Sequence, residues 1–272
     1  MKKIAILPTL LTLGNGVCGF VAIAYVSTIT PNTPPGEINH LFLLSACLIL
    51  AAMVFDALDG YAARLSKSAS DFGGQLDSLC DAISFGLAPA FLLLRLGMDW
   101  TKELVSQPVV IIGGLYMVCA VLRLARFNLE NSPDPASHKR FKGLPSPAAA
   151  GCVVSLAILR ATSWSTINPE TMQMLMTVCV PLGTLVAALL MVSRVSYPHI
   201  TKQILRGRRP FSVIVQLVLA LFIIAMTPHL ACFLLFWGYA LNGLIRHVVF
   251  RVMRSKAPLP EMEPTKEPSI HH

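Results

Sequence analysis

Segment 56–81 carries four aspartates at helical spacing within an otherwise apolar part of the chain. Asp56 and Asp59 are three residues apart, and Asp77 and Asp81 are four apart, so on helices each pair would share one face. Carboxylates that face one another repel unless a proton or a cation lies between them. Oxygen ligands without cysteine or histidine favour Mg²⁺, Mn²⁺ or Ca²⁺. The spacing therefore predicts a divalent-metal site.

Small and basic residues next to the first pair indicate what such metals would face. Gly60 and Ala63 leave one side of the helix without bulk, so a ligand could approach the backbone there. Arg64 follows about one turn after Asp59, and its planar guanidinium suits a phosphate. Metals beside an arginine and small residues would form a diphosphate site.

A structural interpretation competes with this one. The aspartates could cap helices and pair with Arg64 and Lys67 at the membrane boundary. Asp71 stands just before Phe72 and the second helix, and we expect it to act as such a cap. The other four acids recur regularly within apolar helices, where charged side chains are costly, and this favours a functional role.

Two apolar runs must position the four aspartates. The first pair lies at the end of run 41–60, and the second pair opens run 77–97. The segment between them, LSKSASDFGG (65–74), is polar and contains glycine, so the chain can turn back there. We expect a helical hairpin that joins both pairs at the cytoplasmic membrane boundary.

The whole chain has the composition of an integral membrane protein. Of its 272 residues, 54% are hydrophobic and 13% charged, with a mean hydropathy of +0.65. A soluble domain would carry about 25% charged residues. Apolar runs close to the length of about 20 residues that crosses a bilayer occur at 13–30, 41–60, 77–97, 107–127, 146–163, 172–193, 211–227 and 230–250. The predicted fold class is an all-α integral membrane protein with about eight transmembrane helices.

The basic residues predict the orientation. With both termini in the cytoplasm, every Lys and Arg except Arg95, Lys102 and Arg160 falls on the cytoplasmic side. The net charge of +8 then reflects topology and anionic lipid rather than nucleic acid, because no basic patch is interleaved with aromatic residues. The N-terminus imitates a signal peptide, but no small-residue cleavage site follows it cleanly. The seven cysteines lie singly in apolar runs and read as small buried hydrophobes.

The chain divides into four predicted parts. These are an N-terminal interfacial segment (1–12), a six-helix catalytic core (13–193), a cytoplasmic basic loop with a C-terminal helix hairpin (194–252), and a disordered tail (253–272). A cation transporter would also carry intramembrane aspartates, but near the midplane or between repeated halves. Here the acids cluster at one boundary and no repeat is visible, so an enzyme is favoured.

The aspartate segment resembles the signature of the CDP-alcohol phosphotransferase family. The matching residues stand at fixed offsets without a gap: Asp56, Asp59, Gly60, Ala63, Arg64, Gly73, Asp77 and Asp81. The resemblance implies a membrane enzyme that cleaves a CDP-activated lipid or alcohol and releases CMP. It implies that the four aspartates hold two divalent ions, with Asp81 also acting as general base. The nucleotide and its diphosphate would be held by Gly60, Ala63, Arg64, Ser70 and Gly73.

Further stretches are similar to the membrane-embedded bacterial phosphatidylserine synthases within this family. They are LPTLLTLGNGVCGF (7–20), SFGLAPA (84–90), LRLARFN (122–128) and FKGLPSPAAAG (141–151). Thr9 departs from the Asn that usually follows Pro8, so Thr12 or Asn15 would contribute more to holding the nucleotide. The resemblance also implies a homodimer in the inner (cytoplasmic) membrane, with its active site at the cytoplasmic face.

The acceptor side is predicted at the end of the fourth apolar run. Arg123 and Arg126 share a face there, with Lys142 across a short loop, and cations of this kind would bind the carboxylate of serine. Glycerol 3-phosphate or inositol phosphate would attract them too, and positive-inside anchoring is the structural alternative. Ser146 is an open candidate for substrate contact. The predicted reaction transfers the phosphatidyl group of CDP-diacylglycerol to L-serine and releases CMP, with another acceptor alcohol as the alternative.

Overall fold

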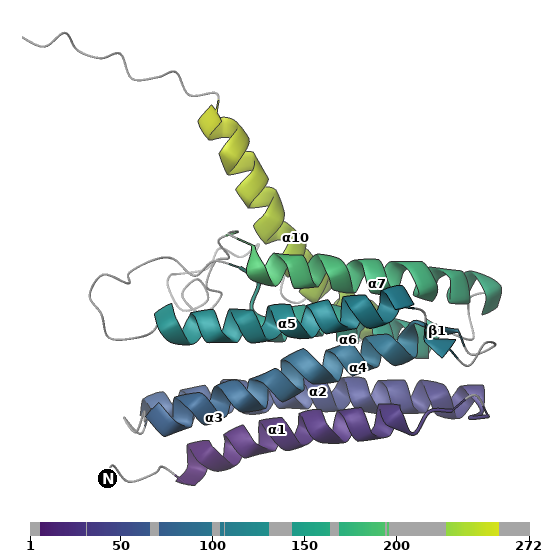
Figure 1. Ribbon diagram of the computed structural model, residues 1–272, viewed down its shortest axis with the longest axis horizontal. Helices are drawn as coiled ribbons and strands as arrows, with labels where there is room; N and C mark the ends of the chain where they lie inside the picture. The colour runs from purple at the N-terminus through teal and green to yellow at the C-terminus, as the bar shows by residue number, and fades with distance from the viewer. Residues whose placement is uncertain are drawn as a thin grey trace, which may run out of the picture.

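The computed structural model describes residues 6–30, 32–65, 71–99, 104–105, 107–130, 143–163, 169–193, 195 and 227–255. Long helices packed side by side make up almost all of this part of the chain (Figure 1). They are α1 (Ile6–Ser27), α2 (Pro35–Leu65), α3 (Asp71–Asp81), the π-helix η1 (Ala82–Leu87), α4 (Ala88–Leu96), α5 (Gln107–Glu130), α6 (Ser146–Ser163), α7 (Pro169–Val192) and α10 (Pro228–Ser255). Two-residue strands, β1 (Met98–Asp99) and β2 (Leu104–Val105), pair antiparallel between α4 and α5. The predicted all-α membrane fold is confirmed.

Helices long and apolar enough to cross a bilayer make up most of the described chain. They cover Ile6–Ser27, Pro35–Leu65, Phe72–Leu96, Gln107–Leu129 and Pro228–Arg246, and shorter apolar helices cover Ser146–Thr162 and Met176–Val192. Each corresponds to one of the predicted runs. The remaining run, 211–227, lies outside the described residues except for Thr227. A total of eight crossings therefore stays a prediction.

Proline marks where several of these helices begin. Pro35, Pro169 and Pro228 are the first residues of α2, α7 and α10, and Pro147 is the second residue of α6. A proline in the first turn loses no helical hydrogen bond, because the first N–H groups of a helix have no partner within it. α1 instead begins at Ile6, earlier than the start of the apolar run at residue 13.

Helix α6 lies at the centre of the bundle. Its residues Ala149, Ala150, Val153 and Ala157 are all fully buried. Small side chains let neighbouring helices approach closely, as membrane helix packing requires. A Cβ atom at Gly151 would lie 2.1 Å from Cδ1 of Phe236, so α10 packs directly onto α6 at this point.

The outward faces are apolar and suit a lipid environment. On α1, Leu10, Leu13, Val17 and Phe20 are all exposed. A soluble protein rarely exposes so continuous an apolar face, but lipid chains are themselves apolar. Figure 1 shows α1, α2 and the continuous rod α3–η1–α4 along one side of the bundle, with α5 and α7 on the other.

Candidate active site

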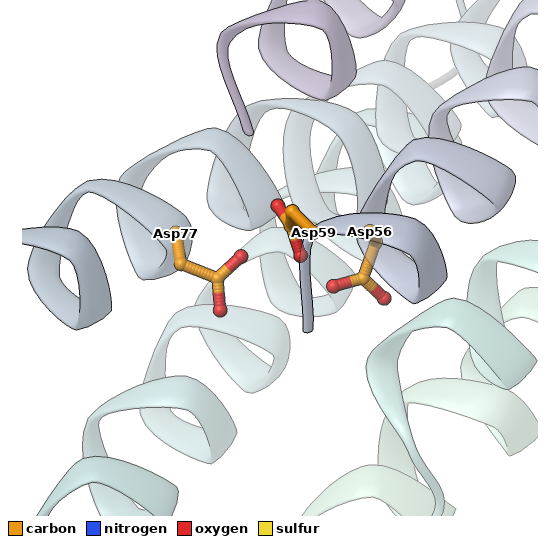
Figure 2. Close-up of side chains that lie close together, drawn as sticks. All are labelled: Asp56, Asp59 and Asp77. Atoms are coloured by element: carbon orange, nitrogen blue, oxygen red, sulfur yellow. The ribbon is translucent and has the colours of Figure 1, made fainter. Parts of the chain in front are cut away.

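Two helices bring three carboxylates together. Asp56 and Asp59 lie near the end of α2, and Asp77 lies in α3. One ligand oxygen from each lies within 4.8 Å of the others, and Figure 2 shows the three side chains directed toward a shared space. The predicted meeting of both aspartate pairs at one hairpin is thereby confirmed for these three residues.

The donor set at this point fits a divalent cation. Oδ1 of Asp77 and Oδ1 of Asn15 are buried and have no hydrogen-bond partner among the described residues. Buried polar oxygens without partners are costly, and three carboxylates at this distance repel one another without a cation. Oxygen ligands of this kind are those that Mg²⁺, Mn²⁺ and Ca²⁺ prefer.

Asp81 lies beside the three-carboxylate group. It is the last residue of α3, one turn after Asp77, and only 7% of its surface is exposed. Its charge lies near enough to interact with those of Asp56, Asp59 and Asp77. It is not among the three aspartates whose oxygens lie within 4.8 Å of one another. This separation suits a group that handles a proton next to the metal ligands.

Helix α1 supplies a hydrogen bond to one aspartate of each pair. Thr12 Oγ1 donates to Oδ2 of Asp59 at 2.7 Å, and Asn15 Nδ2 donates to Oδ1 of Asp81 at 2.9 Å. Both α1 residues are buried. Binding of the nucleotide by Thr12 and Asn15 stays a prediction. The contacts seen here orient the carboxylates, and nothing in the local sequence pairs these residues.

Of the residues predicted to hold the nucleotide, those that the structure describes lie at the end of the bundle that carries the aspartates. A Cβ atom at Gly60 would meet nothing nearer than Nη1 of Arg64, at 3.6 Å, so this side of α2 is open. Ala63 is half-buried, Arg64 is exposed, and Gly73 lies in the first turn of α3. Ser70 and Lys142 lie outside the described residues.

Arg123 of α5 is held beside the aspartates. Its guanidinium donates a hydrogen bond to the hydroxyl of Ser146 and lies 5.9 Å from the ring centre of Phe127. Its charge is near enough to interact with Asp56 and Asp81. Arg126, one turn further along α5, is half-buried. Of the predicted acceptor residues in the described chain, Arg123 therefore has the clearer connection to the aspartates.

A tight turn presents Ser146 to Arg123. Gly143 has a φ of +97°, and its N–H donates to the carbonyl of Val195 at 2.7 Å. A Cβ atom there would lie 2.2 Å from the carbonyl oxygen of Met191, so only glycine fits. The next amide, of Leu144, donates to the carbonyl of Leu190 at 2.9 Å. The chain before α6 is thus fastened to the end of α7.

Comparison with known proteins agrees with this geometry. The model of the CDP-alcohol phosphatidyltransferase family matches residues 5–182. The chain belongs to this family. The matched region contains the four aspartates, Arg64, Arg123 and Ser146. As a CDP-alcohol phosphatidyltransferase, the chain is a membrane transferase of a metal-dependent family, and its aspartate triad could bind a metal.

Proteins named CDP-diacylglycerol–serine O-phosphatidyltransferase in three organisms are similar to this phosphatidyltransferase. The protein of Helicobacter pylori (strain ATCC 700392 / 26695) is 29% identical over 254 residues, which are 93% of this chain and 95% of the relative. That of Bacillus subtilis (strain 168) is 31% identical over 196 residues (72% and 92%). That of Methanocaldococcus jannaschii is 34% identical over 208 residues (76% and 86%). The similarity to the first extends well beyond residue 182.

Sequence reasoning missed two further contacts of this phosphatidyltransferase. Asn128 Nδ2 donates to the hydroxyl of Ser78 at 2.8 Å and joins α5 to α3 between Asp77 and Asp81. Tyr239 of α10 lies near enough to Arg123 to interact with its charge. Asn128 belongs to the LRLARFN stretch, whose family resemblance could have marked it as a functional residue. Its partner Ser78 could be known only from the packing of α3 on α5.

Proposed function

We propose that this phosphatidyltransferase moves the phosphatidyl group of CDP-diacylglycerol to the hydroxyl of L-serine, forming phosphatidylserine and CMP. The observation that carries the proposal is the guanidinium of Arg123, which is bonded to Ser146 and lies within electrostatic range of Asp56 and Asp81. A guanidinium at this position would bind a small carboxylate near the aspartates, which supports serine as the acceptor. The names of the relatives that align over most of this chain support the same acceptor.

On the donor side, Asp56, Asp59 and Asp77, with Asp81 next to them, would hold two divalent ions, Mg²⁺ or Mn²⁺, with Ca²⁺ as a third option. The chemistry supplied by such ions is neutralisation of the diphosphate charge. Arg64, Gly60 and Ala63 lie on the open side of α2 and would receive the nucleotide end of the diphosphate. Ser70, Gly73, Thr12 and Asn15 are proposed to assist.

Asp81 acts as the general base of the reaction. Its Oδ1 is already bonded by Asn15, which leaves Oδ2 to accept the proton of the serine hydroxyl. The serine oxygen forms a bond to the phosphorus that carries the diacylglycerol. The bond from this phosphorus to the bridging diphosphate oxygen breaks, and CMP leaves with the electron pair.

On the acceptor side, Arg123 binds the serine carboxylate through two parallel N–H groups. Its bond to Ser146 and its position over Phe127 fix the guanidinium before the acceptor arrives, so less entropy is lost on binding. Arg126 and Lys142 are proposed to add positive charge around the same carboxylate. A bound serine would then present its hydroxyl toward Asp81.

The site opens toward the cytoplasm, and both termini lie on that side. Arg64 stands near the end of α2, shortly after Asp56 and Asp59, whereas Arg95 and Arg160 stand at the far ends of the α3–η1–α4 rod and of α6. The positive-inside rule therefore favours the cytoplasmic side for the aspartates. The inner membrane and a homodimer, as the family resemblance implies, complete the proposal.

One assay tests the acceptor. Purified protein in detergent receives CDP-diacylglycerol, Mg²⁺ or Mn²⁺, and one of L-serine, glycerol 3-phosphate or inositol phosphate, and CMP and lipid products are measured. We expect phosphatidylserine and an equal amount of CMP with serine only, and none after chelation of the metal. A different phospholipid in place of phosphatidylserine would contradict the acceptor. Absence of CMP with every acceptor would favour the transporter alternative.

A further inference from the structure

The helix that carries Asp77 and Asp81 changes its winding directly after Asp81. Residues Ala82–Leu87 form the π-helix η1, and the N–H of Ala88 donates to the carbonyl of Ile83, five residues earlier. A π-helical turn holds an extra residue, is rare, and is found frequently at functional sites. Because η1 begins directly after Asp81, the proposed base, the cause of this change in winding bears on how Asp81 is positioned.

Pro89 explains why the α-helical pattern is broken here. In an α-helix the N–H of residue 89 would donate to the carbonyl of Phe85. Proline has no N–H, and its ring crowds the carbonyl four residues earlier. The α-helix therefore cannot continue with its normal hydrogen bonds past Phe85, and the extra residue of η1 accommodates the proline.

Tyr116 of α5 provides a donor for the Phe85 carbonyl. Its hydroxyl donates to that oxygen at 3.0 Å, and the whole tyrosine is 0% exposed. No water or lipid could replace this bond without opening the packing between α5 and η1. The π-helical turn is thus stabilised from a different helix.

The turn is fastened to α1 as well. Ser84 Oγ donates to the carbonyl of Asn15 at 2.8 Å, and Asn15 in turn donates to Asp81. A Cβ atom at Gly19 would lie 2.7 Å from Cα of Ser84, so the two backbones are in direct contact. Helix α1 therefore holds both Asp81, through Asn15, and the π-helical turn that follows it, through Ser84.

The extra residue decides the direction of the aspartates. Each residue turns an α-helix by about 100°, so removing one from η1 would rotate α3 by about that angle relative to α4. Leu92 and Leu93 of α4 are fully buried and fix the direction of that half. If η1 relaxed to an α-helix, Asp77 and Asp81 would turn away from α2.

We propose that Tyr116 is a positioning residue of this phosphatidyltransferase: by bonding the Phe85 carbonyl it holds the π-helical turn and so aims Asp81 at the acceptor hydroxyl. The inference rests on the proposed role of Asp81. Tyr116 is 0% exposed and therefore out of reach of either substrate, so its loss should act on the chemical step rather than on substrate binding.

The test is Tyr116→Phe, which removes only the hydroxyl. Full-length protein in detergent is assayed for kcat and for the KM of each substrate by CMP release, and its thermal unfolding is recorded. We expect kcat to fall about tenfold, because small misplacements of a reacting group are costly, while both KM values stay within about twofold. Ser155→Ala is the matched control. It removes another fully buried hydroxyl, which donates to the Cys152 carbonyl at 2.8 Å, and should keep kcat.

Several results would overturn the proposal. They are a wild-type kcat in Tyr116→Phe, a rise in KM without a fall in kcat, or an equal fall in kcat for Ser155→Ala. If Tyr116→Phe does not fold, Ser84→Ala removes the bond of the turn to α1 and is judged by the same values. The ratio of variant to wild type is measured with whichever acceptor the wild type uses. A failure of serine as acceptor would therefore be recognised separately.

Discussion

At the scale of single residues, the four aspartates differ in what they contact. Asp59 and Asp81 each accept a hydrogen bond from α1, while Oδ1 of Asp77 has no partner among the described residues. A carboxylate oxygen without a protein donor is available to a cation, and a carboxylate held by an amide keeps one oxygen in a fixed direction. The free oxygen of Asp77 supports its proposed metal-binding role, and the fixed oxygen of Asp81 supports its proposed role as base.

The first residue-scale prediction concerns the base. Asp81→Asn should lower CMP release by at least about 100-fold, since an amide cannot take the serine proton. Metal-dependent binding of CDP-diacylglycerol should be largely retained. Asp77→Asn is the comparison, and it should weaken metal binding as well. Titration of Mn²⁺ with the two variants distinguishes them; an Asp81→Asn variant with most of its turnover would rule out Asp81 as base.

The second residue-scale prediction concerns the acceptor. Arg123→Ala should raise the KM for serine about tenfold or more, because a charge-assisted bond to a carboxylate contributes about 1.5–3 kcal/mol. The KM for CDP-diacylglycerol should change little. Arg64→Ala, on the face of α2 proposed to hold the nucleotide, should show the reverse pattern. If Arg123→Ala mainly raised the lipid KM, Arg123 would belong to the donor side.

At the scale of elements, the site depends on how closely α1 approaches the α3–η1 rod. Gly16 and Gly19 face Cys80 and Ser84, and a Cβ atom on Gly16 would lie 3.0 Å from Sγ of Cys80. This approach brings Thr12 and Asn15 within hydrogen-bonding distance of the aspartates. A helix that only anchors the chain in lipid would not require glycine at these positions.

Gly19→Ala tests this contact. The new Cβ atom would lie 2.4 Å from Oγ and 2.7 Å from Cα of Ser84, and relieving such overlap costs about 1–3 kcal/mol. We expect a lower thermal unfolding midpoint in detergent and a lower rate of CMP release. Gly114→Ala is the control, because a Cβ atom there meets nothing within 4 Å. Equal behaviour of the two variants would contradict the close packing of α1 on η1.

At the scale of the whole molecule, the site draws on more of the chain than the region that matches the family model. Residues 5–182 contain the aspartates, Arg123 and Ser146. Helix α10 lies beyond that region, yet it packs on α6, where Trp237 Nε1 donates to the Cys152 carbonyl at 3.2 Å. It also carries Tyr239 to the neighbourhood of Arg123.

The proposed orientation is tested on the intact membrane. In a cysteine-free background, Lys67→Cys and Lys102→Cys are treated with a membrane-impermeant thiol reagent in whole cells and in opened cells. We expect Lys102→Cys to react in both and Lys67→Cys only after opening, because the positive-inside rule places residue 67 in the cytoplasm. Labelling of Lys67→Cys in whole cells would reverse the topology.

The sequence by itself determined the membrane class, the locations of the described helices and the faces of the aspartates. The length of an apolar run and the spacing of Asp56, Asp59 and Asp77 are local properties of the sequence. Helix geometry alone fixes whether a run can cross a bilayer and on which face of its helix each side chain lies. Pro89 is a local signal for an interrupted helix, but the π-helix η1 was not predicted from it. Helix α1 begins at Ile6, before the apolar run at residue 13, because polar residues such as Thr9 do not end a helix by themselves.

Only the tertiary structure decided which residue holds which carboxylate. Thr12 and Asp59 are 47 residues apart, and Asn15 and Asp81 are 66 apart, so their pairing depends on how α1 crosses α2 and α3. The same holds for Arg123 with Ser146 and for Tyr116 with Phe85. Side chains on separate helices meet only after the helices pack, and the period of one helix carries no information about the rotation of another.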